Sequence, residues 1–408
     1  MRRYVHRLCW TTALLLCGCM QISPPARVAW PVQDVGAAPQ ENLEAACVGD
    51  YDPATDYFPQ KTSFTHSAQI TVEYAGHYKR VVFRPTVATG EVLEYLFVQC
   101  GTPVPPHDPH VQVVQVPIQR LVTGNSAMLG ALDELGLVDR LYGAENVRNT
   151  TVPAVKERIA QGLVNDMWGY GHATIEQVMS VKADVYLSFY SAYPSGNMHP
   201  RLWELGVRAF PQADHHERHP LGRAEWLKVL ALLTNREARG DAVFNHIAEQ
   251  YQALAALTRA VAHRPLVLAG YAASRDSFET FGIDNQRAQL VRDAGGRVAI
   301  DDPSPSSLIY LPFEKAYLQG VAADVWLGTL GGQASVDALV SANRLHGMFD
   351  AAKHRRVHAW DRGYTGAWAY PYQDQGMTRP HILLAETIGA LHPHLLPARE
   401  ATFLRRLP

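Results

Sequence analysis

Two halves of this sequence repeat one local pattern, and that repeat constrains the fold more than any other feature. TIEQVMSVKADVYLS at 174–188 reads as a short helix, an Ala-Asp turn and an apolar strand, and FEKAYLQGVAADVWLG at 313–328 repeats the same order. Around each copy, β-branched runs alternate with amphipathic runs of helical period. Such alternation predicts a parallel sheet with helices on both faces, one in each half of the chain.

Between the halves lies an apolar-periodic stretch with few helix breakers. It predicts two helices, over 222–235 and 236–262. At 1.5 Å per residue, the second would span roughly 35 Å, about one domain diameter. A chain of 408 residues has room for two or three domains. We therefore expect an α/β fold of two lobes, each with a central parallel sheet flanked by helices, joined by one long α-helix.

The region before the first lobe has a different character. Four runs rich in β-branched and aromatic residues predict a small β appendage, which is either a contact surface or a decoration of the next domain. The expected organisation is a signal peptide at 1–18, a lipid-anchored tether at 19–60, the β appendage at 61–117, the N-terminal α/β lobe at 118–235, the linking helix at 236–262 and the C-terminal α/β lobe at 263–408.

The N-terminus predicts export. Three arginines precede a short apolar run, which is too short to span a bilayer and is typical of a secretory signal. The run ends in Leu16-Cys17-Gly18-Cys19, which resembles a bacterial lipobox and makes Cys19 the expected lipidated residue. The alternative is a plain cleaved signal. We expect an exported protein, lipid-anchored to the cell envelope and facing the periplasm.

Export also bears on the remaining cysteines. After processing, Cys47 and Cys100 are left in an oxidising compartment, where we expect them to form a disulfide. Two free thiols are the alternative. The net charge of −2 and the lack of a basic stripe argue against a nucleic-acid partner. The common catalytic motifs are absent, so we expect no enzyme activity, no catalytic residue and no resident metal or cofactor.

Further motifs complete a family resemblance. Together with the repeated pattern, PLGRAEWLKVLALL at 220–233 and RPHILLAETIGALHPHLLP at 379–397 make the region 118–397 similar to bacterial ABC-transporter substrate-binding proteins of the iron-siderophore, haem and vitamin B12 group. The resemblance implies a monomer that delivers a small metal chelate to an ABC transporter permease and its ATPase. It also implies one exposed glutamate on each lobe, Glu176 and Glu314, that docks to permease arginines.

The ligand should lie between the lobes, beyond the C-terminal ends of the strands. Many of the residues that follow predicted strands are aromatic, and aromatic walls with a few polar groups suit an iron chelate, haem or a corrinoid. The candidate ligand-binding residues are Asn125, Trp168, Tyr170, Tyr190, Tyr193, Glu217, His219, Tyr271, Tyr310, Arg362, Tyr364, Trp368 and Tyr370.

Two other functions stay open at this point. ADHHERHP places His216, Glu217 and His219 close together, which suits a zinc-type ion if they point inward; otherwise the segment is a solvated loop. That hypothesis makes the chain a metal-ion binding protein, or a metal-dependent exported enzyme or chelatase, on a similar bilobed fold. The second is an adhesion or scaffold lipoprotein that binds a partner through the β appendage.

Overall fold

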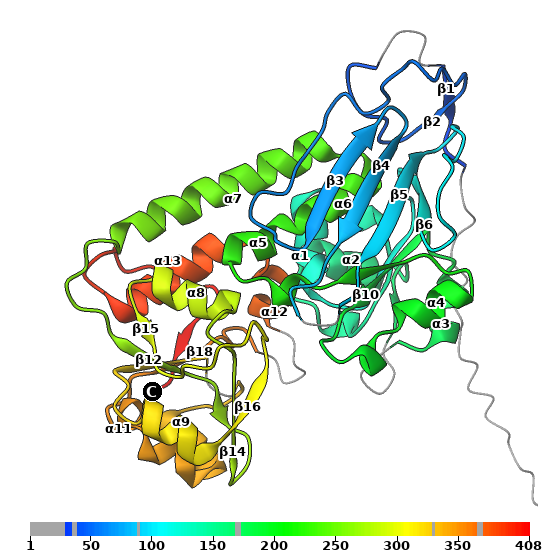
Figure 1. Ribbon diagram of the computed structural model, residues 1–408. Coiled ribbons are helices and arrows are strands. Elements are labelled where there is room, and N and C mark those ends of the chain that lie inside the picture. The colour runs from blue at the N-terminus through cyan, green and yellow to red at the C-terminus, as the bar shows by residue number, and fades with distance from the viewer. Residues whose placement is uncertain (1–28, 35–38, 88–89, 168–172, 329–330, 365–369) are drawn as a thin grey trace, which may run out of the picture.

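The computed structural model describes residues 29–34, 39–87, 90–167, 173–328, 331–364 and 370–408. Figure 1 shows two α/β lobes at the two ends of the long helix α7 (Glu237–Leu257) and a small β sheet against the N-terminal lobe. The expected fold class is confirmed. Within the described ranges, no helix is both long and apolar enough to span a membrane.

The N-terminal lobe contains a five-stranded parallel sheet with strand order β11-β10-β7-β8-β9. Its strands are β7 (Leu121–Thr123), β8 (Leu141–Ala144), β9 (Asn165–Asp166), β10 (Val185–Phe189) and β11 (Ala209–Gln212). Its helices are α1 (Ala127–Glu134), α2 (Pro153–Ala160), α3 (Ile175–Val181) and α4 (His199–Glu204). Strand β10, between β11 and β7, is buried at four of its five residues, as parallel strands covered on both faces usually are.

The C-terminal lobe has a second main sheet with order β15-β12-β17-β18-β19. Its strands are β12 (Leu266–Ala269), β15 (Arg297–Val298), β17 (Val325–Leu327), β18 (Val357–Ala359) and β19 (Arg405–Arg406), of which β19 pairs antiparallel at the edge. A separate antiparallel sheet joins β13 (Tyr271–Ala272), β14 (Ser277–Thr280) and β16 (Ile309–Pro312). The helices are α8 (Gln286–Asp293), α9 (Phe313–Gly320), α10 (Val336–Ala342), α11 (Asp350–Lys353), α12 (Pro371–Gln375) and α13 (Pro380–Leu391).

The repeated Ala-Asp turn has the same structural role in both lobes. The Asp184 carboxylate accepts hydrogen bonds from the Gln119 and Arg120 amides, at 2.7 and 2.8 Å, just before β7. The Asp324 carboxylate likewise accepts from the Leu266 amide at 2.8 Å, at the start of β12. Each aspartate therefore satisfies backbone donors at the start of the neighbouring strand, β7 in one lobe and β12 in the other.

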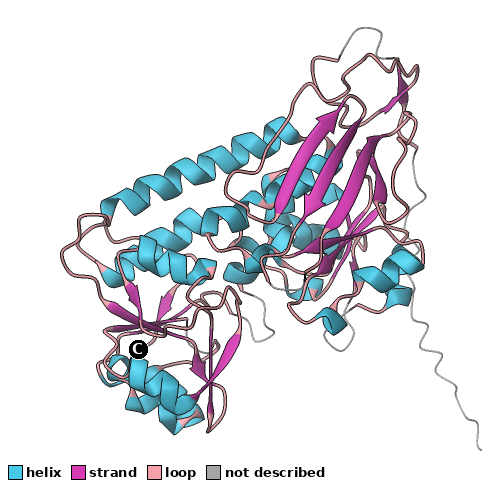
Figure 2. Ribbon diagram, viewed as in Figure 1, coloured by secondary structure: helices cyan, strands magenta, loops and turns pink. Residues whose placement is uncertain are grey.

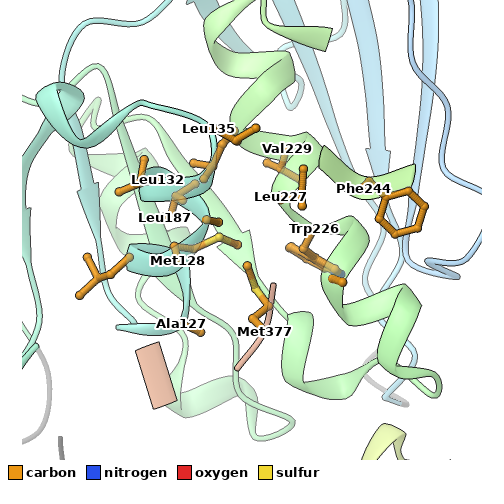
Figure 3. Close-up of a cluster of buried hydrophobic side chains, with 14 of the residues drawn as sticks. Ala127, Met128, Leu132, Leu135, Leu187, Trp226, Leu227, Val229, Phe244 and Met377 are labelled. Atoms are coloured by element: carbon orange, nitrogen blue, oxygen red, sulfur yellow. The ribbon is translucent and has the colours of Figure 1, made fainter. Parts of the chain in front are cut away.

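The segment before α7 forms two helices where the sequence predicts one. They are α5 (Pro220–Glu225) and α6 (Leu227–Thr234), separated at Trp226. Figure 3 shows the core that they build, with Trp226 and Leu227 facing Met128 of α1 and Leu187 of β10. All eight residues of α6 are buried, so this helix lies inside the lobe, and α7 is the long helix that runs from one lobe to the other.

The appendage is a four-stranded sheet of order β3-β4-β5-β6 (Figure 2). Its strands are β3 (Ile70–Ala75), β4 (Tyr78–Phe83), β5 (Leu93–Gln99) and β6 (Gln112–Val116). The alternating hydrophobicity places Val81 and Phe83 in the core that also contains the N-terminal lobe. The appendage is thus packed onto that lobe.

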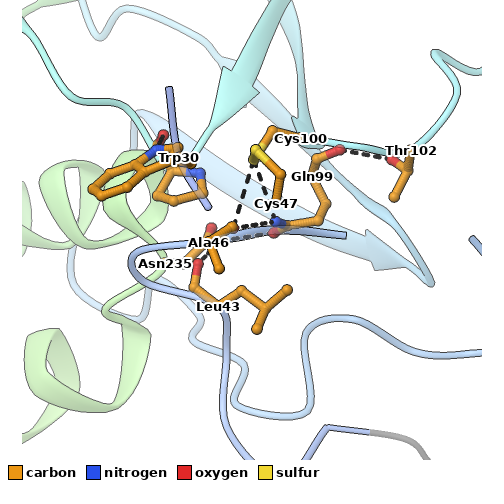
Figure 4. Close-up of a disulfide and its surroundings, with 9 residues drawn as sticks. Trp30, Leu43, Ala46, Cys47, Gln99, Cys100, Thr102 and Asn235 are labelled. Atoms are coloured by element: carbon orange, nitrogen blue, oxygen red, sulfur yellow. Dashed lines mark hydrogen bonds between the residues drawn. A yellow bond between two sulfur atoms is a disulfide. The ribbon is translucent and has the colours of Figure 1, made fainter. Parts of the chain in front are cut away.

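Residues expected to form a tether are partly packed against the same sheet. The short parallel pair β1 (Val32–Gln33) and β2 (Cys47–Val48) lies there, and Tyr57 and Phe58 are buried. Cys47 and Cys100 are joined by the expected disulfide, which links β2 to the residue after β5 (Figure 4). The sequence did not predict this packing, because a segment without periodicity gives no sign of the partner surface that covers it.

Candidate ligand-binding site

A pocket of about 230 Å³ lies in the C-terminal lobe, where several strands of its main sheet end. Gly270 and Tyr271 follow β12, Gly328 follows β17, and Trp360 and Asp361 follow β18; all five line the pocket. Ligands of open parallel sheets bind at the carboxyl ends of the strands. The pocket therefore lies where the sequence analysis expected a ligand, beyond the C-terminal ends of the strands.

Aromatic rings form one side of this pocket. Trp360 and Tyr372 are stacked with ring centroids 5.5 Å apart, and Tyr370 lies parallel to Tyr372 at 6.4 Å. Tyr364 meets Tyr370 edge to face at 5.9 Å. Trp360, Tyr370 and Tyr372 therefore line the pocket, with Tyr364 packed against one of them, and such a wall suits a bulky ligand with an extended π system.

The Arg287 side chain faces these rings. The Arg287 guanidinium lies 5.9 Å from the centre of the Tyr372 ring and 6.0 Å from that of Phe281, and its Nε has no hydrogen-bond partner among the described residues. A buried donor without a partner costs about 1–3 kcal/mol. An anionic or oxygen-rich group in the pocket would satisfy it.

The charges around the pocket lower the pKa of one phenol. Burial by itself would raise the pKa of Tyr372, but the nearby guanidiniums of Arg287 and Arg223 outweigh it and lower that pKa. Arg223 is itself paired with Asp214, at 2.9 Å between Nε and the carboxylate. The two guanidiniums therefore favour the ionised form of the Tyr372 phenol.

Gly270 permits the close chain crossing that shapes this pocket. Its φ of 101° belongs to the region that side chains rarely adopt, and a Cβ there would collide with the Glu279 carbonyl oxygen. The end of β12 can consequently lie directly against β14. This contact brings the antiparallel sheet to the pocket.

Several predicted ligand residues lie at or beside the pocket. Tyr271 and Tyr370 line it. Tyr310 is exposed on β16, and Tyr364 packs on Tyr370. The phenol of Tyr193, exposed on the N-terminal lobe, contributes to raising the Tyr310 pKa after the larger effects of Glu279 and burial.

Other predicted residues are held by contacts within the protein. Tyr190 is fully buried and its hydroxyl donates to Glu91, in the segment between β4 and β5, at 2.8 Å. Glu217 is also buried; it accepts from Trp226 Nε1 at 2.8 Å and from Ser67 Oγ at 2.5 Å. Burial raises the Glu217 pKa. Neither side chain reaches a ligand in this arrangement, because each connects the N-terminal lobe to the appendage.

Three more candidates have local roles. Asn125 Oδ1 accepts from the Ala127 amide at 2.8 Å, at the start of α1. His219 Nδ1 caps α5 by accepting from the Leu221 amide at 3.0 Å. Arg362 pairs with Glu400 at 2.6 Å on the surface and does not line the pocket. Trp168, Tyr170, Trp368 and Cys19 lie outside the described residues.

The histidine cluster does not form a metal site in the described part of the chain. No group of three or more His, Cys, Asp or Glu side chains is placed there to hold an ion. His215 stacks on Phe189 with ring centroids 4.7 Å apart, and His216 is buried beside it. The zinc hypothesis depended on neighbouring side chains converging, and their orientations differ.

Sequence reasoning missed Arg287 and Glu279. Arg287 lies two residues after Asn285, the N-cap of α8, and an arginine near a helix end is usually exposed to solvent, so its position gave no sign of a pocket. Glu279 lies on β14, within an antiparallel sheet that the alternating pattern did not reveal. The sequence did contain a sign of this strand. In Ser277–Thr280 the second and fourth residues are buried and the first and third are not, which is the alternation expected of a strand.

The predicted docking glutamates lie on the surface of separate lobes. Glu176 is in the first turn of α3 and Glu314 in the first turn of α9, and both are exposed. Hydrogen bonds from its own backbone amide and from the Thr174 side chain lower the pKa of Glu176. Both carboxylates are accessible to a partner.

The lobes also contact each other directly. Asp374 of α12 accepts from the Thr150 hydroxyl at 2.8 Å and from the Thr151 amide at 2.6 Å. Arg379 pairs with Glu134 of α1 at 3.0 Å. These contacts act together with α7 to restrain the relative motion of the lobes.

Comparison with known proteins gives the family. The sequence profile of the family described as periplasmic binding protein matches residues 121–364, which is more than half of the chain. The chain belongs to this family. The family's members are binding components, in agreement with the prediction that this protein is not an enzyme.

Individual relatives are distant. An uncharacterized lipoprotein of Methanocaldococcus jannaschii is 20% identical over 299 residues, covering 72% of this chain and 69% of its own length. A periplasmic haem-binding protein from Pseudomonas aeruginosa matches with a TM-score of 0.54 and 17% identity, over 71% of this chain and 98% of that one.

A second solved structure, of an ABC-type ferric hydroxamate transport system from Saccharomonospora viridis, has a TM-score of 0.51 at 14% identity, over 68% of this chain and 94% of that one. At these identities the likeness to solved structures extends to the fold.

Proposed function

We propose that this protein is the extracytoplasmic substrate-binding component of an ABC importer and that it captures an iron-siderophore, haem or corrinoid-type ligand between its lobes. The observation that carries the proposal is the aromatic pocket with Arg287 at the strand ends, in a chain of the periplasmic binding protein family. The proteins of similar fold named for haem and ferric hydroxamate support the same ligand class.

The chemistry of the pocket matches such a ligand. The rings of Trp360, Tyr370 and Tyr372 offer stacking surfaces, and Arg287 offers a donor for anionic oxygens. Iron chelates and haem carry carboxylate or other oxygen groups around a flat or compact body. A ligand of this kind would use the rings and the guanidinium together.

Delivery would use the surface glutamates and the membrane anchor. Glu176 and Glu314 would pair with arginines on the two permease subunits, one on each lobe, and fix the orientation of the complex. Lipidation of Cys19 would keep the protein near the permease, and the lipoprotein relative supports this part of the proposal.

A binding titration with paired variants tests the proposal. Ferric siderophores, haem and cobalamin are added separately to the mature protein while tryptophan fluorescence is followed. One of them should quench saturably. Arg287→Gln should lower the affinity for that ligand by about tenfold or more, since a hydrogen bond to a charged group contributes about 1.5–3 kcal/mol.

Arg362→Gln is the matched control, because Arg362 carries the same charge but pairs with Glu400 away from the pocket. If Arg287→Gln and Arg362→Gln lost the same amount of ligand affinity, the assignment of this pocket as the binding site would be refuted. An absence of saturable binding by all three ligands would refute the proposed function.

A further inference from the structure

A second pocket, of about 380 Å³, lies where the end of α1 and the start of α13 meet the long helix α7. Figure 1 shows α13 running alongside α7. Glu134 of α1, five residues of α7 between Arg239 and Ile247, and the segment 378–382 line the pocket. Among the described residues, it shares no lining residue with the pocket at the strand ends. Its volume lies within the range of pockets that hold small organic molecules, about 300–1,000 Å³.

The charged side chains of this pocket leave one positive charge unbalanced. Arg379 donates to the Glu134 carboxylate from Nε and Nη2, at 3.1 and 3.0 Å. Arg239, the second arginine of the lining, donates to the backbone carbonyl of Glu134 at 2.8 Å. Because Glu134 is the only carboxylate among the described lining residues, it offsets one of the two guanidiniums. The pocket therefore favours a ligand with a single negative charge.

Two histidines also line the pocket. His246 Nε2 accepts a hydrogen bond from the Gln250 side-chain amide at 2.6 Å, so the proton of a neutral His246 lies on Nδ1, which is then a donor. His381 Nδ1 is buried and has no hydrogen-bond partner among the described residues. A buried nitrogen without a partner is unfavourable, and an oxygen bound beside it would satisfy it.

The surroundings of His381 keep its imidazole neutral. Burial lowers the His381 pKa to about 4, and the positive groups His246 and Arg379 add to this effect. Arg399 acts in the same sense and Glu134 in the opposite one. A negative group beside the ring counteracts the positive groups and raises the pKa of the imidazole. Binding of an anion should therefore be coupled to proton uptake at His381.

Apart from Thr378, the rest of the lining is apolar. It consists of Ala242, Val243 and Ile247 of α7 and Ile382 of α13. Apolar walls with a few polar groups hold a compact apolar body and orient it through its polar group. The fork of a guanidinium matches a carboxylate, which it can bind through two hydrogen bonds.

We propose that the pocket between α1, α7 and α13 is a second binding site, which takes a small organic carboxylate with a compact apolar body. This site goes beyond the proposed function, because the transported chelate occupies the pocket at the strand ends. Arg239, His246 and His381 bind the carboxylate, and the apolar side chains cover the body of the ligand. A ligand held there contacts both lobes and the helix that joins them.

Benzoate, a carboxylate on a compact apolar ring, is the probe, and its binding to the mature protein is measured by isothermal titration calorimetry at neutral pH. Saturable binding is expected. Arg239→Gln should lower the affinity for benzoate by about tenfold, the loss expected for one charge-assisted hydrogen bond. Arg239 is exposed, so this variant should fold normally. An absence of saturable binding to the unmodified protein would overturn the inference.

Arg259→Gln is the matched control. Arg259 is exposed just after the end of α7 and does not line the pocket, so its variant should bind benzoate as the unmodified protein does. If Arg259→Gln lost as much affinity as Arg239→Gln, the overall charge of the surface would explain the effect and the assigned pocket would be wrong.

The candidate ligand pocket and the ligand class are tested separately. Arg287→Gln should leave the benzoate affinity unchanged, whereas a loss in that variant would place benzoate in the pocket at the strand ends and overturn the second site. Benzamide lacks the charge and inorganic phosphate lacks the apolar body, so each should bind at least about tenfold more weakly than benzoate. Equal affinity for either one would refute the assigned ligand class.

The His381 imidazole gives a readout inside the pocket. Its NMR titration, assigned with the variant His381→Gln, should show a pKa of about 4 in the free protein and a higher pKa with saturating benzoate. The affinity for benzoate should rise correspondingly as the pH falls from 7.5 to 5.5, where benzoate stays ionised. A His381 pKa that does not change when benzoate binds would contradict the proposed position of the carboxylate.

Discussion

The Lys79 ammonium of β4 forms a buried ion pair with the Glu237 carboxylate in the first turn of α7. Lys79 also donates to the Leu232 carbonyl at 2.7 Å, and the second Glu237 oxygen accepts from Asn42 Nδ2 at 2.7 Å. Both side chains are fully enclosed. This contact attaches the appendage to the helix that joins the lobes, and it makes the appendage a structural part of the N-terminal lobe.

Removing one member of this pair should be costly. Lys79→Met leaves the Glu237 carboxylate buried without its counter-charge, and we expect a loss of about 3–5 kcal/mol in the free energy of unfolding, measured by urea denaturation. The double variant Lys79→Met, Glu237→Gln should recover part of the loss. A single variant as stable as the unmodified protein would show that the pair does not hold the appendage.

The disulfide should stabilise the same region. Replacing Cys47 and Cys100 by alanine opens a loop that spans 53 positions, and we expect a loss of about 4 kcal/mol in unfolding free energy. The unmodified protein under reducing conditions should lose a similar amount. If the reductant also destabilises the double alanine variant, its effect does not arise from this bond.

Stability should fall on acidification below the ordinary histidine pKa. Burial lowers the pKa of His216 and of His358 to about 4 from 6.5. Between those values the unfolded chain binds protons that the folded protein does not, so each histidine destabilises the fold by up to about 1.4 kcal/mol per pH unit as the pH drops. Above pH 6.5 this contribution vanishes.

Melting temperatures from pH 7.5 to 4.5 check this expectation. His358→Gln, which cannot take up a proton, should show a shallower decline than the unmodified protein. An unchanged slope in that variant would mean that other groups cause the acid sensitivity.

The contact between α12 and the N-terminal lobe should limit the motion of the lobes. Asp374→Asn weakens the hydrogen bonds to Thr150 and Thr151, and we expect a wider range of lobe openings with little change in the secondary structure. Small-angle scattering should show only slight compaction when the unmodified protein binds its ligand, because α7 and this contact hold the lobes. A large compaction would contradict the restraint.

Charge reversal at the docking residues should separate transport from binding. Glu176→Arg and Glu314→Arg should abolish ligand uptake in cells that contain the importer and leave the ligand affinity of the isolated protein unchanged. Glu249→Arg, an exposed reversal on α7, is the control and should support uptake. If ligand uptake were unchanged in both the Glu176→Arg and the Glu314→Arg variants, these glutamates would not be the docking residues.

Much of the fold could be predicted from the sequence because it depends on local periodicity. The helix, the Ala-Asp turn and the strand around Asp184 and Asp324 are local, and they specify two parallel sheets. The antiparallel sheet of β13, β14 and β16 was missed. Its strands are two to four residues long, and their alternation only becomes distinct once Phe278 and Leu311 are known to face the core.

The site could be predicted less well, because position after a strand does not determine orientation. Tyr271 and Tyr370 reach the pocket, whereas Tyr190 turns inward to Glu91. Arg287 reaches it from a helix terminus that no strand-based rule considers. The orientation of each of these side chains is set by contacts with residues up to about a hundred positions away in the sequence, as with Tyr190 and Glu91.

Hydrogen exchange with and without the bound chelate tests the central claim most directly. The account predicts that the ligand identified by titration slows exchange at the pocket backbone, in 270–281 and 360–364, and leaves α7 near His246 unchanged. Protection confined to α7 or to the N-terminal sheet, with none at the pocket, would contradict the account.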